Sequence, residues 1–448
     1  YMTDIISLFK SDIYNGINYL ESKNIIKDFN KNNLSIDFSS KSKQGDLSTN
    51  IFLVLIKKKI DNNFDLKDYL YNFFNNLDYV SDLEIAKAGF INIFIKKKFI
   101  LLKLKNLPHD TDKRNIKLDN KENVNIEFVS ANPTGPIHIA HMRGAVLGDV
   151  MASILESVGN KVTREYYVND AGSQITILGN SLFKRYQELF DIKVVLKDGE
   201  YPGDYLIDIA KLIKKIDGNK WLDFKHQKLK DDYFQNFGVR SIIAGIKEDL
   251  SSLNINFDKF SYESEIVKKN LIVKVFNILK ENNLIYEGVL EKPLGINKEV
   301  WQSRKQLLFR STNFSDDSDR PFKKSNGEWT YFANDSAYHY DKYLRGFDKL
   351  INVWGADHIG YISRMKSITD VVSKKKNYLD ILVCQIVKLI KNGENLKMSK
   401  RDGNFITLNQ IFKEVGRDAL RYFMISSKSE TPMDFDMNKV IEKNKDNP

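Results

Sequence analysis

Two histidines lie three residues apart, in a segment rich in turn-forming residues. His138 and His141 follow Pro133, Gly135 and Pro136, after a predicted strand and at the start of a predicted helix. Both rings therefore face the same side of the first helical turn, where unpaired backbone N–H groups attract anions. This arrangement predicts a nucleotide-phosphate site. Zinc is disfavoured, because the spacing differs from that of helical zinc sites and no cysteine lies nearby. A purely structural histidine pair is the other alternative.

Two lysines with the same spacing occur much later in the chain. Lys397 and Lys400 belong to the stretch Leu396-Lys-Met-Ser-Lys-Arg-Asp-Gly-Asn404, which follows a predicted strand and turn. Gly403 allows this loop to bend, and two ammonium groups suit closing over a polyphosphate and neutralising its charge. A basic loop alone is usually a solvated surface feature. This one and the histidine segment, however, are predicted to lie at the two ends of one α/β unit.

The residues around the histidines predict a strand, a loop, a helix and a second strand. Residues 124–129 alternate as a strand, the helix that starts at His138 ends at Gly159-Asn160, and residues 161–168 form the next strand. Such a unit usually forms a right-handed parallel crossover. The three-and-four spacing predicts one buried helix face, made of Val146, Leu147, Val150, Met151, Ile154, Leu155 and Val158.

The rest of the chain continues the alternation of strands and helices. Strands are predicted at 328–333, 350–354 and 381–390, and a helix near 361–373. This order predicts the α/β fold class, with a doubly wound, Rossmann-like parallel sheet. The predicted domains are a small α/β domain at 1–105, a linker at 106–123, a nucleotide-binding domain at 124–400 with an insertion at roughly 180–300, and a helical segment at 401–448.

Composition limits the class of protein. The 448 residues are 42% hydrophobic and 29% charged, which suits a folded chain with several cores. The longest apolar runs, at 51–56 and 381–387, are far shorter than the about 20 residues that cross a membrane, and the first residues lack a signal-peptide pattern. We therefore expect a cytoplasmic protein without membrane contact. The single cysteine, Cys384, excludes an internal disulfide and a multi-cysteine zinc site, so no structural metal is expected.

The charge balance permits a nucleic-acid partner. The 69 basic and 59 acidic residues give a net charge of +10, which attracts phosphate. Lysine runs at 57–59, 96–98 and 374–376 are better explained as solvated surface than as RNA contacts. Charge alone therefore leaves RNA binding open.

The two spaced pairs resemble the two signature sequences of class I aminoacyl-tRNA synthetases, in the right order and separation. Further segments resemble bacterial arginyl-tRNA synthetases. They are Glu127-Phe-Val-Ser-Ala-Asn-Pro-Thr-Gly-Pro136, Arg164-Glu-Tyr-Tyr-Val-Asn-Asp-Ala-Gly172, Glu328-Trp-Thr-Tyr-Phe-Ala-Asn-Asp335, Tyr338-His-Tyr-Asp-Lys342 and Val353-Trp-Gly-Ala-Asp-His358. The resemblance covers nearly the whole chain and is strongest from 125 to 436.

This resemblance implies an arginine–tRNA ligase. The carboxylate of L-arginine would attack the α-phosphorus of ATP, bound with Mg²⁺ as the substrate complex, and the arginyl group would then pass to the terminal ribose of tRNA(Arg). The resemblance also implies that activation requires bound tRNA and that residues 1–105 contact it. We expect a monomer.

The same resemblance implies roles for single residues. The catalytic set is His138, His141, Lys397 and Lys400; the ATP-binding set is His138, His141, Gly355, Asp357, Met398, Ser399 and Lys400; the arginine-binding set is Glu127, Asn132, Tyr331, Asp335 and His358. Carboxylates are needed in an arginine pocket, because an unpaired guanidinium in a cleft is costly. Glu127 and Asp335 match the positions that supply them, although each acid would also suit a structural salt bridge.

The chain departs from the family pattern at two points. Ala140 replaces the glycine usual between the two histidines, and the family continues beyond this chain into a helical anticodon-binding domain, so we expect poor tRNA charging.

Three other classes of protein are alternatives to this interpretation. Another class I synthetase, such as a glutamyl or glutaminyl enzyme, would lack the paired acids. A small nucleotidyltransferase would not need the lysine loop. A non-catalytic tRNA-binding paralogue would be expected to lose the signature residues.

Overall fold

The computed structural model divides the chain into two units, residues 1–116 and 117–448. The structure describes residues 5–39, 45–59, 61, 63–86, 88–106, 120–290, 304–314, 316–391, 393–396 and 408–442. The first unit has one hydrophobic core, and the second has two. None of the helices in these ranges is long and apolar enough to cross a membrane.

The first unit packs helices on a four-stranded antiparallel sheet of order β1-β2-β4-β3. Its elements are α1 (Ile5–Ser22), β1 (Ile36–Phe38), β2 (Leu47–Thr49), α2 (Ile51–Ile56), α3 (Leu66–Asn75), β3 (Val80–Ile85), β4 (Ile91–Ile95) and α4 (Lys97–Asn106). Asp65 caps α3 by accepting from the backbone N–H groups of Lys67 and Asp68, at 2.9 and 3.0 Å. Phe9 of α1 and Phe74 of α3 are fully buried in the core between them.

The second unit is built on a five-stranded parallel sheet. Its strands are β5 (Asn123–Glu127), β6 (Lys161–Val168), β7 (Lys259–Tyr262), β11 (Lys349–Gly355) and β12 (Leu379–Cys384), in the order β12-β11-β5-β6-β7. The chain order reverses between β5 and β11. In doubly wound sheets ligands bind at this point, beyond the carboxyl ends of the strands.

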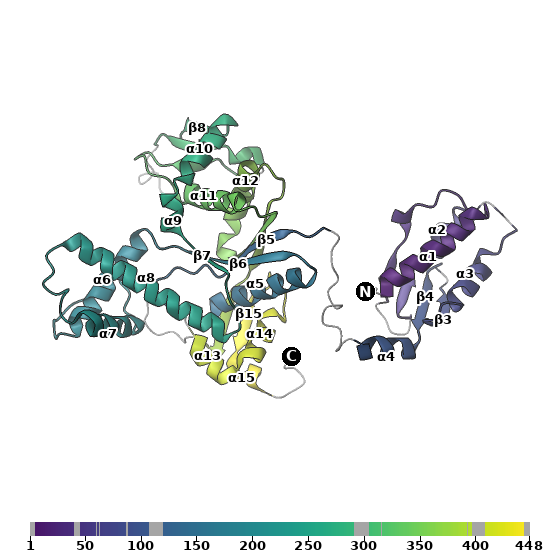
Figure 1. Ribbon diagram of the computed structural model, residues 1–448, viewed down its shortest axis with the longest axis horizontal. Helices are drawn as coiled ribbons and strands as arrows, with labels where there is room; N and C mark the ends of the chain where they lie inside the picture. The colour runs from purple at the N-terminus through teal and green to yellow at the C-terminus, as the bar shows by residue number, and fades with distance from the viewer. Residues whose placement is uncertain are drawn as a thin grey trace. The chain divides into compact units, whose positions relative to one another are not determined.

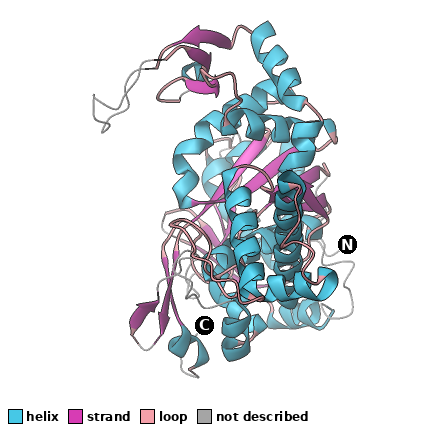
Figure 2. Cartoon of the chain, turned by 90° about the vertical axis from the view of Figure 1, so that its left-hand side faces the viewer, coloured by secondary structure: helices cyan, strands magenta, loops and turns pink. Residues whose placement is uncertain are grey.

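Helices and two small sheets surround the parallel sheet, whose strands run between helices in Figure 2. The helices are α5 (Ile139–Ser157), α6 (Ser173–Glu188), α7 (Tyr205–Asp217), α8 (Gln227–Ser252), α9 (Glu263–Lys268), α10 (Leu271–Glu281), α11 (Tyr331–Leu344), α12 (Ile362–Ser373), α13 (Leu408–Val415), α14 (Arg417–Ile425) and α15 (Met437–Ile441). The small sheets are β8 (Ile285–Gly288), β9 (Gln306–Phe309) and β10 (Arg320–Lys323), and β13 (Val387–Lys391), β14 (Glu394–Leu396) and β15 (Met433–Asp436). Figure 1 shows α5 on one side of β5 and β6, and α10, α11 and α12 on the other.

The structure confirms the predicted α/β fold class and corrects two of the predicted strands. Residues 328–333 are not a strand: Thr330 caps α11 by accepting from the backbone N–H of Ala333, at 3.3 Å, so the helix begins where alternation suggested extension. The strand predicted at 381–390 is two strands, β12 and β13. The residues predicted as an insertion are divided between the β6–β7 and β7–β11 connections.

Helix α5 packs closely on β5. A Cβ atom at Gly148 would collide with the ring of Phe128, so glycine allows the helix to approach the end of this strand. The buried face of α5 includes Met142, Ala145 and Val146, and therefore lies nearer the helix start than predicted. Ile154, predicted to be buried, is 54% exposed.

A buried polar cluster around Glu165 of β6 joins the sheet to α11. Its carboxylate accepts from Asn125 Nδ2 and Ser261 Oγ, both at 2.6 Å, and from the Tyr338 hydroxyl at 2.9 Å. Arg345 lies 2.8 Å away as an ion pair. Burial by itself raises the pKa of Glu165, but Lys342 and Arg345 outweigh it and hold the pKa at about 2.

We expect Glu165→Gln to destabilise the second unit at neutral pH. Because the pKa of Glu165 is about 2 in the folded chain against 4.5 ordinarily, its ionisation contributes about 3 kcal/mol above pH 4.5, and this contribution is lost as pH falls to 2. Urea unfolding at several pH values would show the difference between variant and unaltered chain shrinking below pH 4.5. Glu156→Gln, which removes the half-exposed partner of Arg164, should have little effect. A pH-independent difference would contradict the prediction.

Candidate active site

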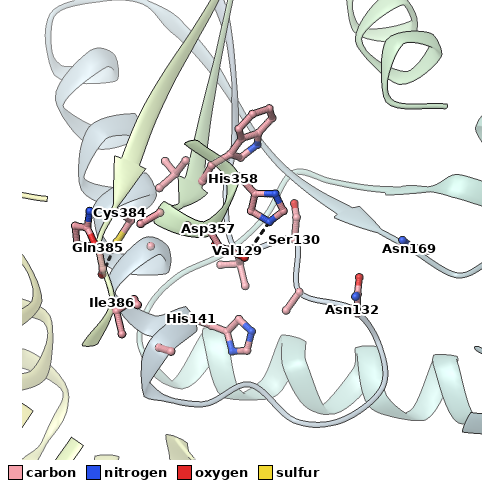
Figure 3. Close-up of a pocket in the computed structure, with 17 residues that line it drawn as sticks. Val129, Ser130, Asn132, His141, Asn169, Asp357, His358, Cys384, Gln385 and Ile386 are labelled. Carbon is pink, nitrogen blue, oxygen red and sulfur yellow. Dashed lines mark hydrogen bonds and ion pairs between the residues drawn. The ribbon is translucent and has the colours of Figure 1, made fainter. Parts of the chain in front are cut away.

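A cavity of about 610 Å³ lies at the carboxyl ends of β5 and β11. Its walls come from the turn after β5, the first turns of α5, the residues after β11 and the connection between β12 and β13. Figure 3 shows His141 and His358 entering this space from different elements, with Cys384, Gln385 and Ile386 along another wall. The cavity is therefore placed where a doubly wound sheet binds nucleotides.

The start of α5 brings the two histidines together. His138 is the residue before the helix, and the ring centroids of His138 and His141 are 4.0 Å apart. The backbone N–H of His138 donates to Nδ1 of His141 at 3.3 Å. Since Nδ1 accepts, the proton of the neutral His141 ring resides on Nε2. His141 lines the cavity and is suited to donate to a phosphate oxygen.

The turn between β5 and α5 is backbone-strained. Val129 and Ser130 have φ values of 67° and 38°, a region that non-glycine residues, and β-branched ones above all, rarely adopt. Strain of this kind costs on the order of 1–3 kcal/mol and is typical of functional sites. The Ser130 hydroxyl holds the turn by donating to Glu127 Oε1 and accepting from the Tyr167 backbone N–H, both at 3.0 Å. The strained turn places both residues on the cavity wall.

A second cavity of about 460 Å³ adjoins the first. It is lined by Tyr331, Asp335, Asp357, His358, Gly360, Tyr361 and Arg364. Asp357 and His358 line both cavities and lie in the 3-10 segment Ala356–Tyr361 that follows β11, with His358 Nε2 3.4 Å from Asp357 Oδ2. Tyr331 and Asp335 lie four residues apart, on one face of α11.

Asp335 is an acid without a neutralising partner in the part of the chain that the structure describes. It accepts from the Tyr361 hydroxyl at 2.7 Å, and among the described residues it forms no ion pair with a basic side chain. Burial raises its pKa to about 7, with Glu127 and Glu263 contributing in the same direction and the Tyr361 hydrogen bond opposing it. The second cavity therefore holds a carboxyl group that a bound cation would stabilise in its ionised form.

Glu127 is already paired. Its Oε2 accepts from the ammonium of Lys342 at 2.6 Å, and the Lys342 side chain is fully buried. Lys342 also donates to Asn352 Oδ1 at 3.3 Å. Direct contact of Glu127 with arginine stays a prediction. In the structure Lys342 of α11 balances the charge of Glu127. Asp335 is therefore the stronger candidate for a guanidinium contact.

A residue that we did not predict, Glu263, joins this acidic group. It follows the carboxyl end of β7, is 6% exposed and accepts from Asn334 Nδ2 at 3.1 Å. Burial raises its pKa, as does the nearby Asp170, while Asn334 lowers it. Its position directly after a parallel strand is the sequence signal that would have identified it. Asp335, Glu263, Glu127 and Asp170 form the acidic cluster. Burial raises the pKa of Tyr167 most, and each of these four acids raises it further.

The other predicted site residues are placed as follows. Asn132 is exposed at the mouth of the first cavity, where its Nδ2 donates to Gln174 Oε1 at 3.0 Å. Gly355 and Ala140 line the same cavity, and Tyr331 is 70% exposed at the second. Lys397, Met398, Ser399 and Lys400 lie outside the described residues, as does Thr407. The predicted roles of all these residues stay predictions.

Comparison with known proteins agrees with this geometry. Residues 103–443 match the family model described as the catalytic domain of class I (R) tRNA synthetases, and residues 11–95 match that of the arginyl-tRNA synthetase N-terminal domain. The second unit is thus the catalytic domain of a class I aminoacyl-tRNA synthetase.

Comparison with individual proteins shows to which family of this class the chain belongs. The arginine–tRNA ligase of Wolbachia pipientis wMel is 42% identical over 448 residues, covering 99% of this chain and 78% of the relative. That of Cereibacter sphaeroides is 43% identical over 408 residues, covering 90% and 70%. The Thermus thermophilus arginyl-tRNA synthetase structure has a TM-score of 0.64 at 15% identity, over 98% of this chain and 78% of that one, and shows the shared fold. The chain belongs to the arginyl-tRNA synthetase family. The predicted family and ligase function are confirmed.

Proposed function

We propose that the two adjoining cavities perform the activation of L-arginine. The arginine carboxylate attacks the α-phosphorus of ATP, the bond to the β-phosphate oxygen breaks, and arginyl-adenylate and pyrophosphate result. The terminal ribose hydroxyl of tRNA(Arg) then takes the arginyl group and releases AMP. The observation that carries this proposal is that Asp357 and His358 line both cavities, so that groups bound in the two cavities meet there.

ATP occupies the larger cavity in this proposal, with Mg²⁺ as part of the substrate. The start of α5 and His141 Nε2–H face the phosphates, while Gly355 and the residues of the β12–β13 connection face the nucleoside. Lys397 directly follows β14 in the sequence, and in this proposal Lys397 and Lys400 neutralise the charge of the same phosphates. No side chain need act as nucleophile, because positioning and charge stabilisation supply the rate.

Arginine places its guanidinium beside Asp335 in the smaller cavity. Tyr331 and His358 flank the side chain, and Asn132 holds the α-amino group. Burial and neighbouring acids raise the pKa values of Asp335 and Glu263. A cation bound there stabilises the ionised form of these carboxyl groups. The ionised carboxylate then forms a charge-assisted hydrogen bond with the planar guanidinium.

Further parts of the proposal concern the rest of the chain. We infer that residues 1–105 contact tRNA and that residues 124–400 carry activation, which agrees with the two matched family models. We also propose a cytoplasmic monomer that needs no structural metal. Within the described ranges, no group of three or more His, Cys, Asp or Glu side chains suits a metal ion.

Calorimetry with L-arginine and three analogues tests the smaller cavity. Citrulline keeps the shape of arginine and loses its charge, so we expect at least about 100-fold weaker binding, because the ionised carboxylate would lose its partner. Lysine keeps the charge without the planar fork, and glutamine lacks both features. The titrations should include tRNA(Arg). Equal affinity for arginine and citrulline would overturn the proposal.

A further inference from the structure

Arg143 is a buried cation in α5 that the proposed chemistry does not use. Its residue is 1% exposed, and it lies two positions beyond His141 along the helix. Arg143 itself is not among the residues that line the cavity, whereas His141 and Gly144 are. A guanidinium buried behind the wall of the site therefore needs a separate explanation.

The Arg143 guanidinium makes four hydrogen bonds, all to the C-terminal part of the catalytic unit. Nη1 donates to the carbonyl oxygens of Thr431 at 2.6 Å and Gln385 at 3.3 Å. Nη2 donates to the carbonyl oxygen of Lys428 at 2.7 Å and to Ser427 Oγ at 3.1 Å. All four acceptors are neutral. Burying a charge on neutral acceptors is costly, so stability alone is a poor reason for a charged residue here.

The acceptors lie where two neighbouring strands begin. Gln385 is two residues before β13, Thr431 is two residues before β15, and β13 and β15 pair in parallel. Two backbone bonds complete the junction, from Gln385 N–H to Ser429 O at 2.8 Å and from Met433 N–H to Ile386 O at 3.0 Å. Arg143 thus fastens α5 to the base of the small β14-β13-β15 sheet.

The residues at the base of that sheet form one wall of the larger cavity. Gln385 and Ile386 line the larger cavity. Strand β13 pairs with β14, and β14 ends at Leu396, directly before Lys397. The start of α5 carries the histidine pair. One guanidinium therefore connects the element that presents His141 with the sheet that precedes Lys397 in the sequence.

We propose that Arg143 is a positioning residue for ATP activation, which holds the start of α5 and the base of the β14-β13-β15 sheet at the separation that the reacting phosphates require. This inference rests on the proposed function. A displacement of about 1 Å, even when it arises away from the chemistry, can cost on the order of 100-fold in rate.

Two substitutions at Arg143 and one at an acceptor test the proposal in ATP–pyrophosphate exchange with tRNA(Arg). Arg143→Met removes all four bonds and should lower kcat roughly 100-fold. Arg143→Lys keeps the charge and part of the bonding, and should lower kcat about 10-fold. Ser427→Ala removes one bond and should lower kcat about two- to five-fold. The Kd for arginine should change less than about two-fold in each, because Asp335 and Tyr331 belong to α11.

Arg421→Met is the matched control. Arg421 of α14 also joins the C-terminal part to α5, through Asp149 Oδ2 at 2.6 Å, and it donates to Leu253 O at 3.0 Å. Asp149 lies two turns beyond His141 along α5. This variant should lower the Tm as Arg143→Met does, yet leave kcat within about two-fold of the unaltered chain. Equal kcat losses in the two variants, or unchanged kcat in Arg143→Lys, would overturn the proposal.

Amide hydrogen exchange gives a readout that does not depend on activity. Arg143→Met, or Arg143→Lys if the Met variant does not fold, should raise exchange in peptides covering 385–396, whereas Arg421→Met should not. Unchanged protection of these peptides would overturn the positioning role. Lack of pyrophosphate exchange by the unaltered chain would instead count against the proposed function, and the two failures are thereby distinguished.

Discussion

Asp335→Asn is expected to weaken arginine binding by roughly 100- to 1000-fold and to raise the thermal stability of the ligand-free chain. The amide keeps the shape of the carboxylate but offers the guanidinium no charge, and a lost charge-assisted contact inside a cleft is among the costliest single changes. Calorimetry with arginine measures the first effect, and thermal unfolding measures the second.

The stabilisation follows from the direction of the Asp335 pKa. The folded-state pKa of about 7 lies above the ordinary value of 3.8, chiefly because of burial. Burial of Asp335 favours its protonated form. The contribution of this group to the free energy of unfolding is therefore present at low pH and is lost as pH rises toward 7. The advantage of Asp335→Asn should grow between pH 4 and pH 7 and stay constant above pH 7.

Arginine binding by the unaltered chain should depend on pH for the same reason. Below pH 7 the guanidinium must displace a proton from Asp335, so affinity should fall by up to about 10-fold per pH unit, with proton release near pH 7. Tyr361→Phe removes a hydrogen bond that lowers the pKa of Asp335, and should move this dependence to higher pH. Affinity that is constant from pH 5.5 to pH 8 would contradict the assignment.

Asp341→Asn provides the control on the same helix. Asp341 is paired with Lys269 at 2.7 Å and with Arg345 at 3.1 Å, and it does not line either cavity. Its substitution removes an acid whose charge is already balanced. We expect lower stability and unchanged arginine affinity, the reverse of the result for Asp335→Asn. Similar losses of arginine affinity in both variants would mean that arginine binding depends on the total negative charge of α11 and not on Asp335 in particular.

His141→Ala is expected to lower kcat of ATP–pyrophosphate exchange by about 100-fold or more, while arginine binding persists. In the proposed function the ring donates where charge develops on the phosphates, and removing one such donor typically has an effect of this size. Lys400→Ala should behave alike. Exchange assays with tRNA(Arg) and arginine calorimetry separate the two effects.

His226→Ala is the matched control for the histidine. His226 precedes α8 in the same way that His138 precedes α5, but it is exposed and, unlike His141, lines neither cavity. Its loss should leave exchange within about two-fold of the unaltered chain. If His141→Ala also abolished arginine binding, the ring would be part of the amino-acid pocket or of the fold. That result would contradict the proposed role of His141 on the phosphates.

Several features of this protein were predictable from the sequence, because they are encoded locally. Alternation and helical spacing were enough to predict β6 at residues 161–168 and the start of α5 near His138. The spaced pairs and the surrounding segments were enough to predict the family. Local patterns were insufficient at 328–333, where alternating side chains belong to the cap and first turn of α11 rather than to a strand. The capping bond of Thr330 decided between the two conformations.

The tertiary structure decided which charges are balanced and which are available to a substrate. Glu127 and Asp335 look equivalent as acids in a sequence, but Lys342, which is 215 residues from Glu127 along the chain, forms an ion pair with Glu127 and not with Asp335. The left-handed backbone at Val129 and the burial that raises the pKa of Glu263 became apparent only in the folded structure. Residue types determine which chemistry is possible. Burial and long-range contacts determine the charge each group carries, because they set its solvation and its partners.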